Sequence, residues 1–424
     1  MLLLQTYSCE YMATIRLQNF GPIKDTGVIT LNDVTLVIGH QSSGKSAFMK
    51  VLCYCRWLEK KIMTSFEDVI PYYTHNKKFM IELMQFHRLN DLYFTADTKI
   101  LYDGDVITIS FPGRKMNAKI LRKEDKWDGR FNTKLCYIPA ERNLVSAVKN
   151  IDKSYKTTER DVLFNFILEW AEGREPYDSE HPIPLTLTAD FKYYNEDEKD
   201  IIVLPNGEKI TAFYASSGVQ SVVPINVMSD YLLSLIGKSA RFSRSDLTNV
   251  LMEILKSSDT MHKVEVNMAD QRIAENFKKK MQYQSMQLFV EEPEQNLFPD
   301  AQRNVIQNLV RTIKKAKGLS AHQTSLVMTT HSPYVLSTLN VLMADAAADM
   351  QLHGDYRLAE IIDQTTLLPL SAYSAYYIDE NGIFRDIKET ELSMISGVDL
   401  DGVSDWVNEH IGMLNQILYA DDEK

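Results

Sequence analysis

The feature of this sequence that most constrains its fold is a glycine-rich loop at residues 39–46, which reads GHQSSGKS. The loop matches in full the pattern G-x-x-x-x-G-K-[ST], in which backbone N–H groups curl around phosphate oxygens. A strand-like apolar run at Val34–Ile38 precedes it, and helical spacing follows over Ala47–Lys61. The helix would then point its positive N-terminal end at a bound phosphate. This order of strand, loop and helix predicts a nucleotide-binding α/β fold.

Each part of this loop has an expected role in holding a nucleotide. The ammonium group of Lys45 is expected to neutralise the β- and γ-phosphates, and the hydroxyl of Ser46 to bind Mg²⁺. The loop therefore predicts ATP and Mg²⁺ as cofactors. The residues expected to contact them are Gly39, Gln41, Ser42, Ser43, Gly44, Lys45, Ser46 and Ala47.

Two adjacent carboxylates follow a second apolar strand, predicted at Met286–Val290. At the carboxyl end of a strand beside a phosphate loop, Glu291 is placed to bind Mg²⁺ and Glu292 to polarise the attacking water as the general base. Two carboxylates so close together are costly unless a cation or a proton compensates them. Taken alone, the pair also fits a solvated acidic turn. The presence of the phosphate loop favours the catalytic interpretation.

Two weaker signals accompany this pair. His331 follows a strand predicted at Ser325–Thr329, and it is placed to hydrogen-bond the γ-phosphate and the water, although an ordinary turn residue is the alternative. Ser216, Ser217 and Gly218 precede a predicted helix, where free N–H groups and hydroxyls can bind an anion. Helix capping alone explains the same pattern, and it is the preferred interpretation of this segment in isolation.

The remainder of the chain alternates strand-like and helical runs. Strands are predicted at residues 13–20, 27–31, 106–111, 135–139, 185–191 and 201–204, with a hairpin turn at 205–207. Helices are predicted at residues 143–172, 217–280 and 299–317. This alternation predicts an α/β domain with a helical insertion. We expect residues 1–140 to form its N-terminal part, residues 141–285 a helical region that carries the serine-glycine turn, and residues 286–424 its C-terminal part.

Charge and cysteine content limit the classes of partner. The net charge is −11 at pH 7, so no general attraction to nucleic acid or anionic lipid is expected. The four cysteines lack paired metal-ligand spacing and are expected to be buried thiols in a reducing compartment. No apolar run approaches the roughly 18 residues of a membrane span, and the first residues do not fit a signal peptide. A cytoplasmic protein without a membrane partner is therefore expected.

In chain order, the four motifs resemble the P-loop, signature, Walker B and His-switch series of ABC-type ATPases. The resemblance implies an α/β ATPase head with a mixed sheet and a helical insertion. It also implies that the signature of one subunit completes the ATP site of another, in a homodimer or a higher homo-oligomer. Ser216 and Gly218 would reach the partner's γ-phosphate, Glu292 would be the general base, and His331 would be the switch.

Further segments look like the SMC-like and OLD-family branch of these ATPases. Residues 15–23, which read IRLQNFGPI, are similar to the start of such heads. The segments YIPAER at 137–142, EEPEQNLFP at 291–299 and THSP at 330–333 look like the OLD type. Gln85 is a candidate for the glutamine of a Q-loop by position only.

OLD nucleases carry a TOPRIM nuclease domain, which the residues after His331 are expected to be too few to form. A head without an effector resembles the stand-alone OLD-like ATPases of bacterial anti-phage systems, such as the Septu and PARIS ATPases. The resemblance implies a sensor and scaffold for a separately encoded nuclease or toxin, with a phage protein or nucleic acid as candidate trigger. Two alternatives stay open: a DNA-repair or recombination ATPase that clamps DNA directly, and a self-contained OLD-like nuclease with Asp399 and Asp401 as metal ligands.

Overall fold

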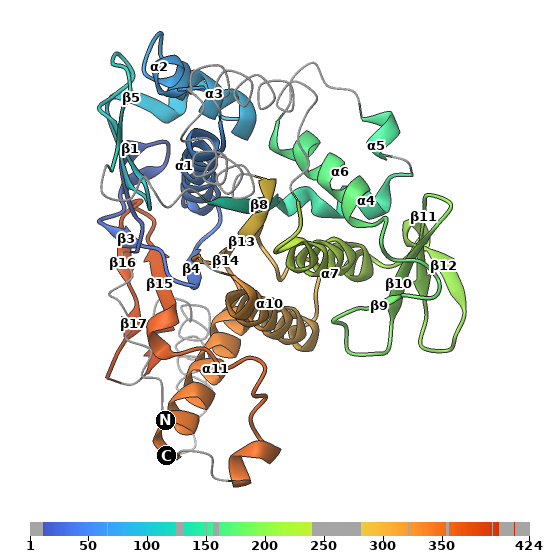
Figure 1. Ribbon diagram of the computed structural model, residues 1–424. Coiled ribbons are helices and arrows are strands. Elements are labelled where there is room, and N and C mark those ends of the chain that lie inside the picture. Colours follow the sequence, from blue (N-terminus) through green and yellow to red (C-terminus); the bar gives the residue numbers. More distant parts are fainter. Residues whose placement is uncertain are drawn as a thin grey trace, which may run out of the picture.

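The computed structural model describes residues 12–65, 67–123, 131–149, 151–155, 161–239, 281–320, 322–352, 356–391, 393–397 and 411. In these ranges the chain forms two large sheets with helix α1 (Lys45–Thr64) packed between them (Figure 1). Further helices cover the opposite face of one of these sheets. The predicted α/β class with a mixed sheet is confirmed.

The central sheet is parallel except at one edge. Its strand order is β16-β15-β4-β14-β13-β8, and only the pair of β15 with β16 is antiparallel. Every residue of β4, β14 and β15 is buried, as in parallel sheets that are covered on both faces. The strands are β4 (Val34–Gly39), β8 (Asn132–Ile138), β13 (Tyr283–Glu291), β14 (Ser325–Thr330), β15 (Tyr373–Ile378) and β16 (Phe384–Asp386). Since parallel strands end at the same edge, the phosphate loop, the carboxylate pair and His331 meet there.

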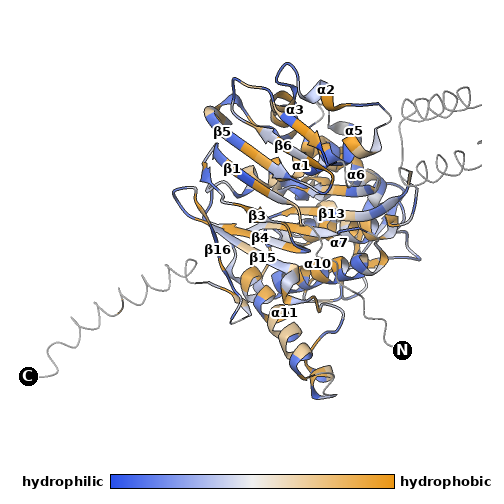
Figure 2. Ribbon diagram, turned by 60° about the vertical axis from the view of Figure 1, so that its left-hand side comes forward, coloured by the Kyte–Doolittle hydropathy of each residue, from blue (hydrophilic) through white to orange (hydrophobic). Residues whose placement is uncertain are grey.

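The second large sheet is antiparallel and packs on the other side of α1. Its order is β2-β1-β5-β6-β7, with β3 paired to β1. Buried and more exposed residues alternate along β1 and β6, which leaves one face of the sheet outward (Figure 2). Its strands are β1 (Thr14–Phe20), β2 (Ile23–Asp25), β3 (Ile29–Thr30), β5 (Phe94–Asp103), β6 (Ile107–Phe111) and β7 (Lys119–Arg122). Between β3 and β6 the chain also forms α2 (Ile70–Tyr73), α3 (Lys78–His87) and the short η1 (Asp91–Tyr93).

Alternate residues of the central strands point into two different cores. Leu36 of β4 belongs to a core shared with the helices of the far face, whereas Val37 belongs to the core around α1. The helices that contribute to the first core include α6 (Val162–Gly173), α7 (Ser217–Leu235), α10 (Pro299–Leu319) and α11 (Pro333–Leu352). The central sheet is therefore fixed from both sides, and its carboxyl edge is a rigid platform.

The region predicted to be helical also contains a small antiparallel sheet. Its order is β12-β11-β10-β9, and the hairpin turn predicted at residues 205–207 connects β11 to β12. The prediction of a strand at residues 185–191 is wrong, because these residues connect β9 to β10. The N–H and hydroxyl of Thr186 both donate to the side chain of Asn226 in α7, so this backbone donor has no strand partner. The strands are β9 (Ile183–Pro184), β10 (Lys192–Glu196), β11 (Lys199–Val203) and β12 (Lys209–Thr211).

The predicted helix at residues 143–172 is broken into shorter pieces, and that at 217–280 is described only in its first part. The first corresponds to α4 (Leu144–Ala147), α5 (Ile151–Ser154) and α6, and the second begins as α7, while residues 240–280 lie outside the described ranges. The remaining short elements are η3 (Ala140–Asn143), η4 (Ala212–Tyr214), η5 (Tyr356–Glu360), η6 (Leu370–Ala372), β17 (Lys388–Glu389) and β18 (Met394–Ile395). Among the described helices, none combines the length and apolar character needed to cross a membrane.

Candidate functional site

The phosphate loop connects β4 to α1 in a backbone conformation that requires its glycines. Gly44 has φ +115° and Ser42 has φ +61°, both in the left-handed region. A Cβ atom on Gly39 would lie 2.5 Å from the carbonyl oxygen of Ile378, so a larger residue there would push the loop away from the sheet. The loop therefore keeps the tight curvature on which backbone capture of phosphate depends.

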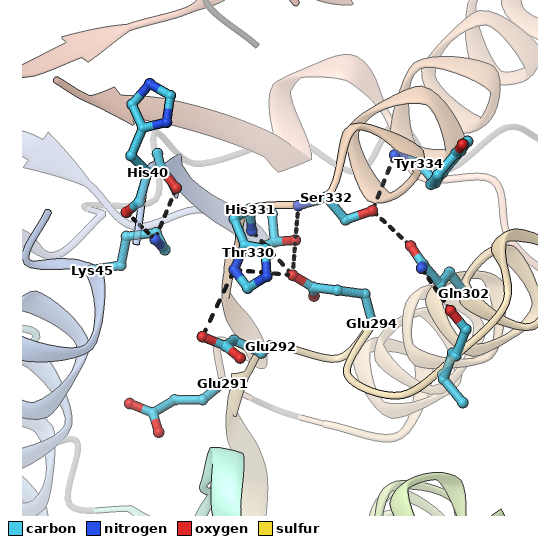
Figure 3. Close-up of polar contacts among 12 residues, drawn as sticks. His40, Lys45, Glu291, Glu292, Glu294, Gln302, Thr330, His331, Ser332 and Tyr334 are labelled. Carbon is cyan, nitrogen blue, oxygen red and sulfur yellow. Dashed lines mark hydrogen bonds and ion pairs between the residues drawn. The ribbon is translucent and has the colours of Figure 1, made fainter. Parts of the chain in front are cut away.

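Lys45 begins α1 and folds back over its own loop. Its Nζ donates to the carbonyl oxygens of Gly39 at 2.8 Å and His40 at 2.6 Å (Figure 3). Burial lowers the pKa of Lys45, and the carboxylates of Glu292 and Glu294 oppose this shift. The hydrogen-bond partners of this buried ammonium are carbonyl oxygens, which carry only partial negative charge. Binding of an anion such as a phosphate beside it is therefore favourable.

Glu291 ends β13 in a buried position, with 5% of its surface exposed. The hydroxyl of Tyr137 donates to its Oε1 at 2.7 Å, and the backbone N–H of Ala140 donates to its Oε2 at 3.1 Å. Burial and the neighbouring Glu291 carboxylate raise the pKa of Tyr137, so the phenol remains a donor. Two donors on β8 and the turn after it thus orient the predicted metal ligand.

Glu292 is half-exposed and lies beside His331. Its backbone has φ +44°, which is unusual for a residue with a side chain, and its N–H donates to the carbonyl of Thr329 at 2.9 Å. Its Oε1 is 3.7 Å from Nδ1 of His331, which is longer than a hydrogen bond. The two predicted catalytic side chains therefore lie face to face with a small gap between them (Figure 3).

Glu294 is a site residue to which the sequence analysis assigned no role. Its Oε1 accepts from the hydroxyl of Thr330 at 2.7 Å and from the backbone N–H of His331 at 3.0 Å. The same oxygen is 3.8 Å from Nδ1 of His331, and its Oε2 is buried without a hydrogen-bond partner among the described residues. This carboxylate fixes the turn that carries His331. The signals for it in the sequence were its position two residues after the carboxylate pair and its place in the segment 291–299.

Arg142 is a second residue that the sequence analysis did not assign. It is fully buried, and its guanidinium donates to the carbonyl oxygens of Glu291 and Glu292, each at 2.7 Å. It also donates to the carbonyl of Ser221 in α7 at 3.1 Å. Burial lowers the pKa of Arg142 to about 10, and the carboxylates of Glu294, Glu292 and Glu291 oppose that shift. The group therefore remains charged at neutral pH.

The serine-glycine turn lies at the exposed N-terminus of α7. Ser216 occupies the N-cap position, but its side chain makes no capping hydrogen bond. Ser216 and Ser217 are exposed, and a Cβ atom on Gly218 would lie 3.1 Å from the carbonyl oxygen of Asn296. The side chain of Ser216 therefore does not cap the helix. The turn instead presents hydroxyls and first-turn N–H groups to the outside.

Two other candidates from the sequence have different positions. Gln85 is an exposed residue within helix α3 and does not belong to a loop. The segment that follows β8 and contacts Glu291 is Pro139–Asn143, through the N–H of Ala140. Asp399 and Asp401 lie outside the described residues.

One family comparison covers the part of the chain that holds the predicted catalytic residues. Residues 264–336 match the protein-family model described as "AAA ATPase domain". This span contains the carboxylate pair and His331, which the fold places at the same sheet edge as the phosphate loop. The chain is a P-loop ATPase. No curated protein sequence matches this ATPase significantly.

Comparison with solved structures finds only distant similarities. The SMC head domain from Thermotoga maritima is 11% identical with a TM-score of 0.32, covering 77% of the ATPase chain and 91% of its own. The structure of the recombination mediator protein RecF-ATPrS in the RecFOR pathway is 11% identical with a TM-score of 0.34, covering 89% and 98%. An Smc head domain bound to the C-terminal domain of ScpA, from Pyrococcus furiosus, is 9% identical with a TM-score of 0.34, covering 89% and 96%. At these values the similarities carry no functional assignment.

The residues of the site fit a magnesium nucleotide. The glycine-rich loop leaves room only for backbone, and the hydroxyl of Ser43 within it is buried without a partner among the described residues. Ser46 and Glu291 offer the hydroxyl and carboxylate oxygens that Mg²⁺ prefers. A carboxylate has about four lone-pair sites, so the two hydrogen bonds to Glu291 leave acceptor capacity for a cation or its water. Mg²⁺ binding by Ser46 and Glu291 remains a prediction.

The contact between Tyr137 and Glu291 leads to a testable prediction. Tyr137→Phe removes the phenol and leaves a buried carboxylate oxygen without that donor. We expect the free energy of unfolding to fall by about 1–3 kcal/mol and the Mg²⁺ concentration for half-maximal ATPase activity to rise a few-fold. Denaturant titration and a magnesium titration of turnover measure the two effects.

Tyr373→Phe is the matched control for this change. The hydroxyl of Tyr373 is also buried, but it has no hydrogen-bond partner among the described residues. Its removal is therefore expected to leave stability and magnesium dependence nearly unchanged. Equal effects of the two substitutions would contradict the role assigned to Tyr137.

Proposed function

We propose that this ATPase hydrolyses ATP at composite sites formed when two copies close on each other, as in ABC-type ATPases. The observation that carries the proposal is an exposed serine-glycine turn on a chain that also holds the phosphate loop and the predicted catalytic side chains. Lys45, Glu292 and His331 come together at the edge of the central sheet, whereas Ser216 and Gly218 lie at the N-terminus of α7, where the exposed Ser216 and Ser217 offer groups suited to a phosphate. In the proposed dimer, a nucleotide bound by the second copy supplies the phosphate for this turn.

The chemistry of such a site follows from the side chains present. The phosphate loop and Lys45 hold the triphosphate, and Glu292 orients a water molecule for in-line attack on the γ-phosphorus and accepts its proton. The bond between the γ-phosphorus and the bridging oxygen breaks, which yields ADP and phosphate. His331, held by Glu294 through its backbone, hydrogen-bonds the transferring phosphoryl group. The signature turn of the partner adds N–H and hydroxyl donors to the same charge.

Substitution of Ser216 tests the composite site. Ser216→Arg places a long cationic side chain where the partner's γ-phosphate would lie, so it blocks close approach of the two copies. We expect ATP hydrolysis to fall by about two orders of magnitude, while ATP binding to the isolated subunit is unchanged, because the phosphate loop is intact. Steady-state turnover and equilibrium binding of ATP measure the two properties.

Ser179→Arg is the control, since it adds the same side chain at an exposed serine between α6 and β9. It is expected to keep wild-type turnover. Normal hydrolysis by Ser216→Arg would show that the turn does not complete an ATP site, and it would overturn the proposed arrangement.

For the biological role, we propose that the ATP-bound dimer is a sensor and scaffold that controls a separately encoded nuclease or toxin in an anti-phage system. The support for this role is the resemblance to stand-alone OLD-like ATPases and the net charge of −11, which favours a protein partner over general attraction to DNA. A homodimer or higher homo-oligomer in the cytoplasm is the expected form.

Copurification from the native operon tests this role. We expect a protein encoded by an adjacent gene to remain with the ATPase in the presence of Mg²⁺-ATP. Isolation of the ATPase without any such protein would contradict the scaffold.

ATP-dependent and salt-sensitive DNA binding by the chain alone would instead favour a DNA-repair ATPase that clamps DNA. Metal-dependent cleavage lost on changing Asp399 and Asp401 would indicate a self-contained nuclease.

A further inference from the structure

We infer that Arg142 is a positioning residue for ATP hydrolysis: it fixes the backbone of the general base Glu292 against the helix that carries the signature turn. The inference rests on the proposed function, because it takes Glu292 as the base and Ser216–Gly218 as the signature. Arg142 itself is remote from solvent and does not need to touch the nucleotide. It acts through the main chain of the carboxylate pair.

The guanidinium of Arg142 connects three segments that are distant in the sequence. Its NH1 and NH2 donate to the carbonyl oxygens of Glu291 and Glu292, each at 2.7 Å. Its Nε donates to the carbonyl of Ser221 at 3.1 Å. The planar fork of arginine makes these bonds in fixed relative directions, which the flexible stem and single ammonium of lysine cannot reproduce.

These bonds act on a backbone that is not in a relaxed conformation. Glu292 has φ +44°, in the left-handed region that residues with side chains rarely adopt. Such a conformation persists only where the surrounding structure imposes it. Three hydrogen bonds impose it here. Arg142 donates to the carbonyl oxygens of Glu291 and Glu292, and the N–H of Glu292 donates to the carbonyl oxygen of Thr329. The direction of the Glu292 side chain therefore depends on Arg142.

The guanidinium of Arg142 is also hydrogen-bonded to the N-terminal part of α7. Ser221 lies in the early turns of this helix, after the signature residues Ser216–Gly218. A second bond joins the helix to the turn after the carboxylate pair, from Nδ2 of Asn296 to Oγ of Ser221 at 3.0 Å. The backbone of Gly218 also lies close to Asn296, since a Cβ atom there would be 3.1 Å from its carbonyl oxygen. Within one chain, the signature turn and the general base thus belong to one bonded unit.

This arrangement has a consequence for a closed dimer. The signature turn of a chain contacts the nucleotide of the partner, whereas Glu292 acts on the nucleotide of its own chain. Arg142 therefore connects a group that engages one ATP with the base that hydrolyses the other. Loss of the hydrogen-bond geometry of Arg142 lowers the rate of the chemical step and leaves ATP binding intact.

Arg142→Lys tests the inference, because it keeps the charge and removes the fork. We expect kcat to fall about 10-fold or more with KM for ATP within about twofold of wild type, because the bonds lost hold the base and not the nucleotide. In the Glu292→Gln background, ATP-dependent dimer formation is expected to be unchanged. Turnover kinetics, light scattering and thermal unfolding measure these properties.

Ser221→Ala is a second variant that removes only the bond from Asn296 and leaves Arg142 in place. We expect a smaller reduction of kcat, about threefold, again with unchanged KM. Its effect is expected to be less than multiplicative with that of Arg142→Lys, because both links join α7 to the same turn. This variant carries the test if Arg142→Lys does not fold.

Arg56→Lys is the matched control, a buried arginine of α1 that is paired with Glu59 and Asp105. We expect its kcat and KM to be those of wild type. If Glu292→Gln forms no dimer with ATP, the proposed function is wrong. If that dimer forms but Arg142→Lys and Ser221→Ala hydrolyse ATP at the wild-type rate, or lower kcat only together with ATP binding, the inference alone is overturned.

Discussion

Glu292→Gln is expected to stop ATP turnover while ATP stays bound and holds the dimer closed. The substitution preserves the size of the side chain but replaces the carboxylate with an amide that does not accept a proton. General base catalysis contributes roughly 10²–10⁴-fold to a rate, so a loss of that order is expected. The backbone bonds from Arg142 and to Thr329 do not involve the side chain, so the site is expected to retain its shape.

Light scattering with and without Mg²⁺-ATP measures the mass of this variant, and phosphate release measures its turnover. We expect a dimer or larger assembly that appears only with the nucleotide. Glu208→Gln, at an exposed position between β11 and β12, is the control and should hydrolyse ATP normally. Turnover by Glu292→Gln within a few-fold of wild type would assign the base elsewhere, and Glu294 would be the next carboxylate to change.

Lys45→Ala is expected to abolish ATP binding under ordinary assay conditions. The ammonium of Lys45 donates to two carbonyls of its own loop, and burial lowers its pKa although the carboxylates of Glu292 and Glu294 oppose the shift. Phosphate oxygens replace these partners with full negative charge, and such charge-assisted hydrogen bonds are strong. The loss of one charged donor in a buried site corresponds to about 100-fold weaker binding.

Titration calorimetry with ATP measures this loss, and thermal unfolding without nucleotide shows whether the fold survives. We expect the unliganded melting temperature to be maintained or slightly raised, because the substitution removes a desolvated charge. Lys50→Ala, further along α1, is the control and should bind ATP as wild type does. Undiminished ATP affinity in Lys45→Ala would mean that the glycine-rich loop is not the nucleotide site.

The parts of the site that were predictable from the sequence are those made by contiguous residues. The phosphate loop is local chemistry: its glycines, its lysine and the strand and helix around it lie within one short segment, and the structure places them as expected. Glu291 and Glu292 were predictable as site residues because they directly follow a largely apolar strand in a chain that also carries the phosphate loop. Their meeting with the loop follows from parallel strand order, a property of the α/β class.

The roles of Arg142, Glu294 and Tyr137 were decided only by the tertiary structure. Arg142 donates to the carbonyl oxygens of Glu291 and Glu292, which lie 149 and 150 positions further along the chain. Backbone carbonyls have no residue identity, so no sequence pattern marks them as partners. The orientation of Tyr137 toward Glu291 likewise depends on the register between β8 and β13.

The small sheet formed by β9–β12 shows the same limit at the level of secondary structure. Residues 185–191 have the composition of a strand, but the side chain of Asn226 from α7 takes the backbone donor of Thr186. By itself the sequence determined the P-loop, the carboxylate pair and the α/β class, since these arise from local spacing and apolar periodicity. The tertiary structure decided which distant polar groups satisfy one another, because buried donors and acceptors pair with whichever partners the packed fold brings within reach.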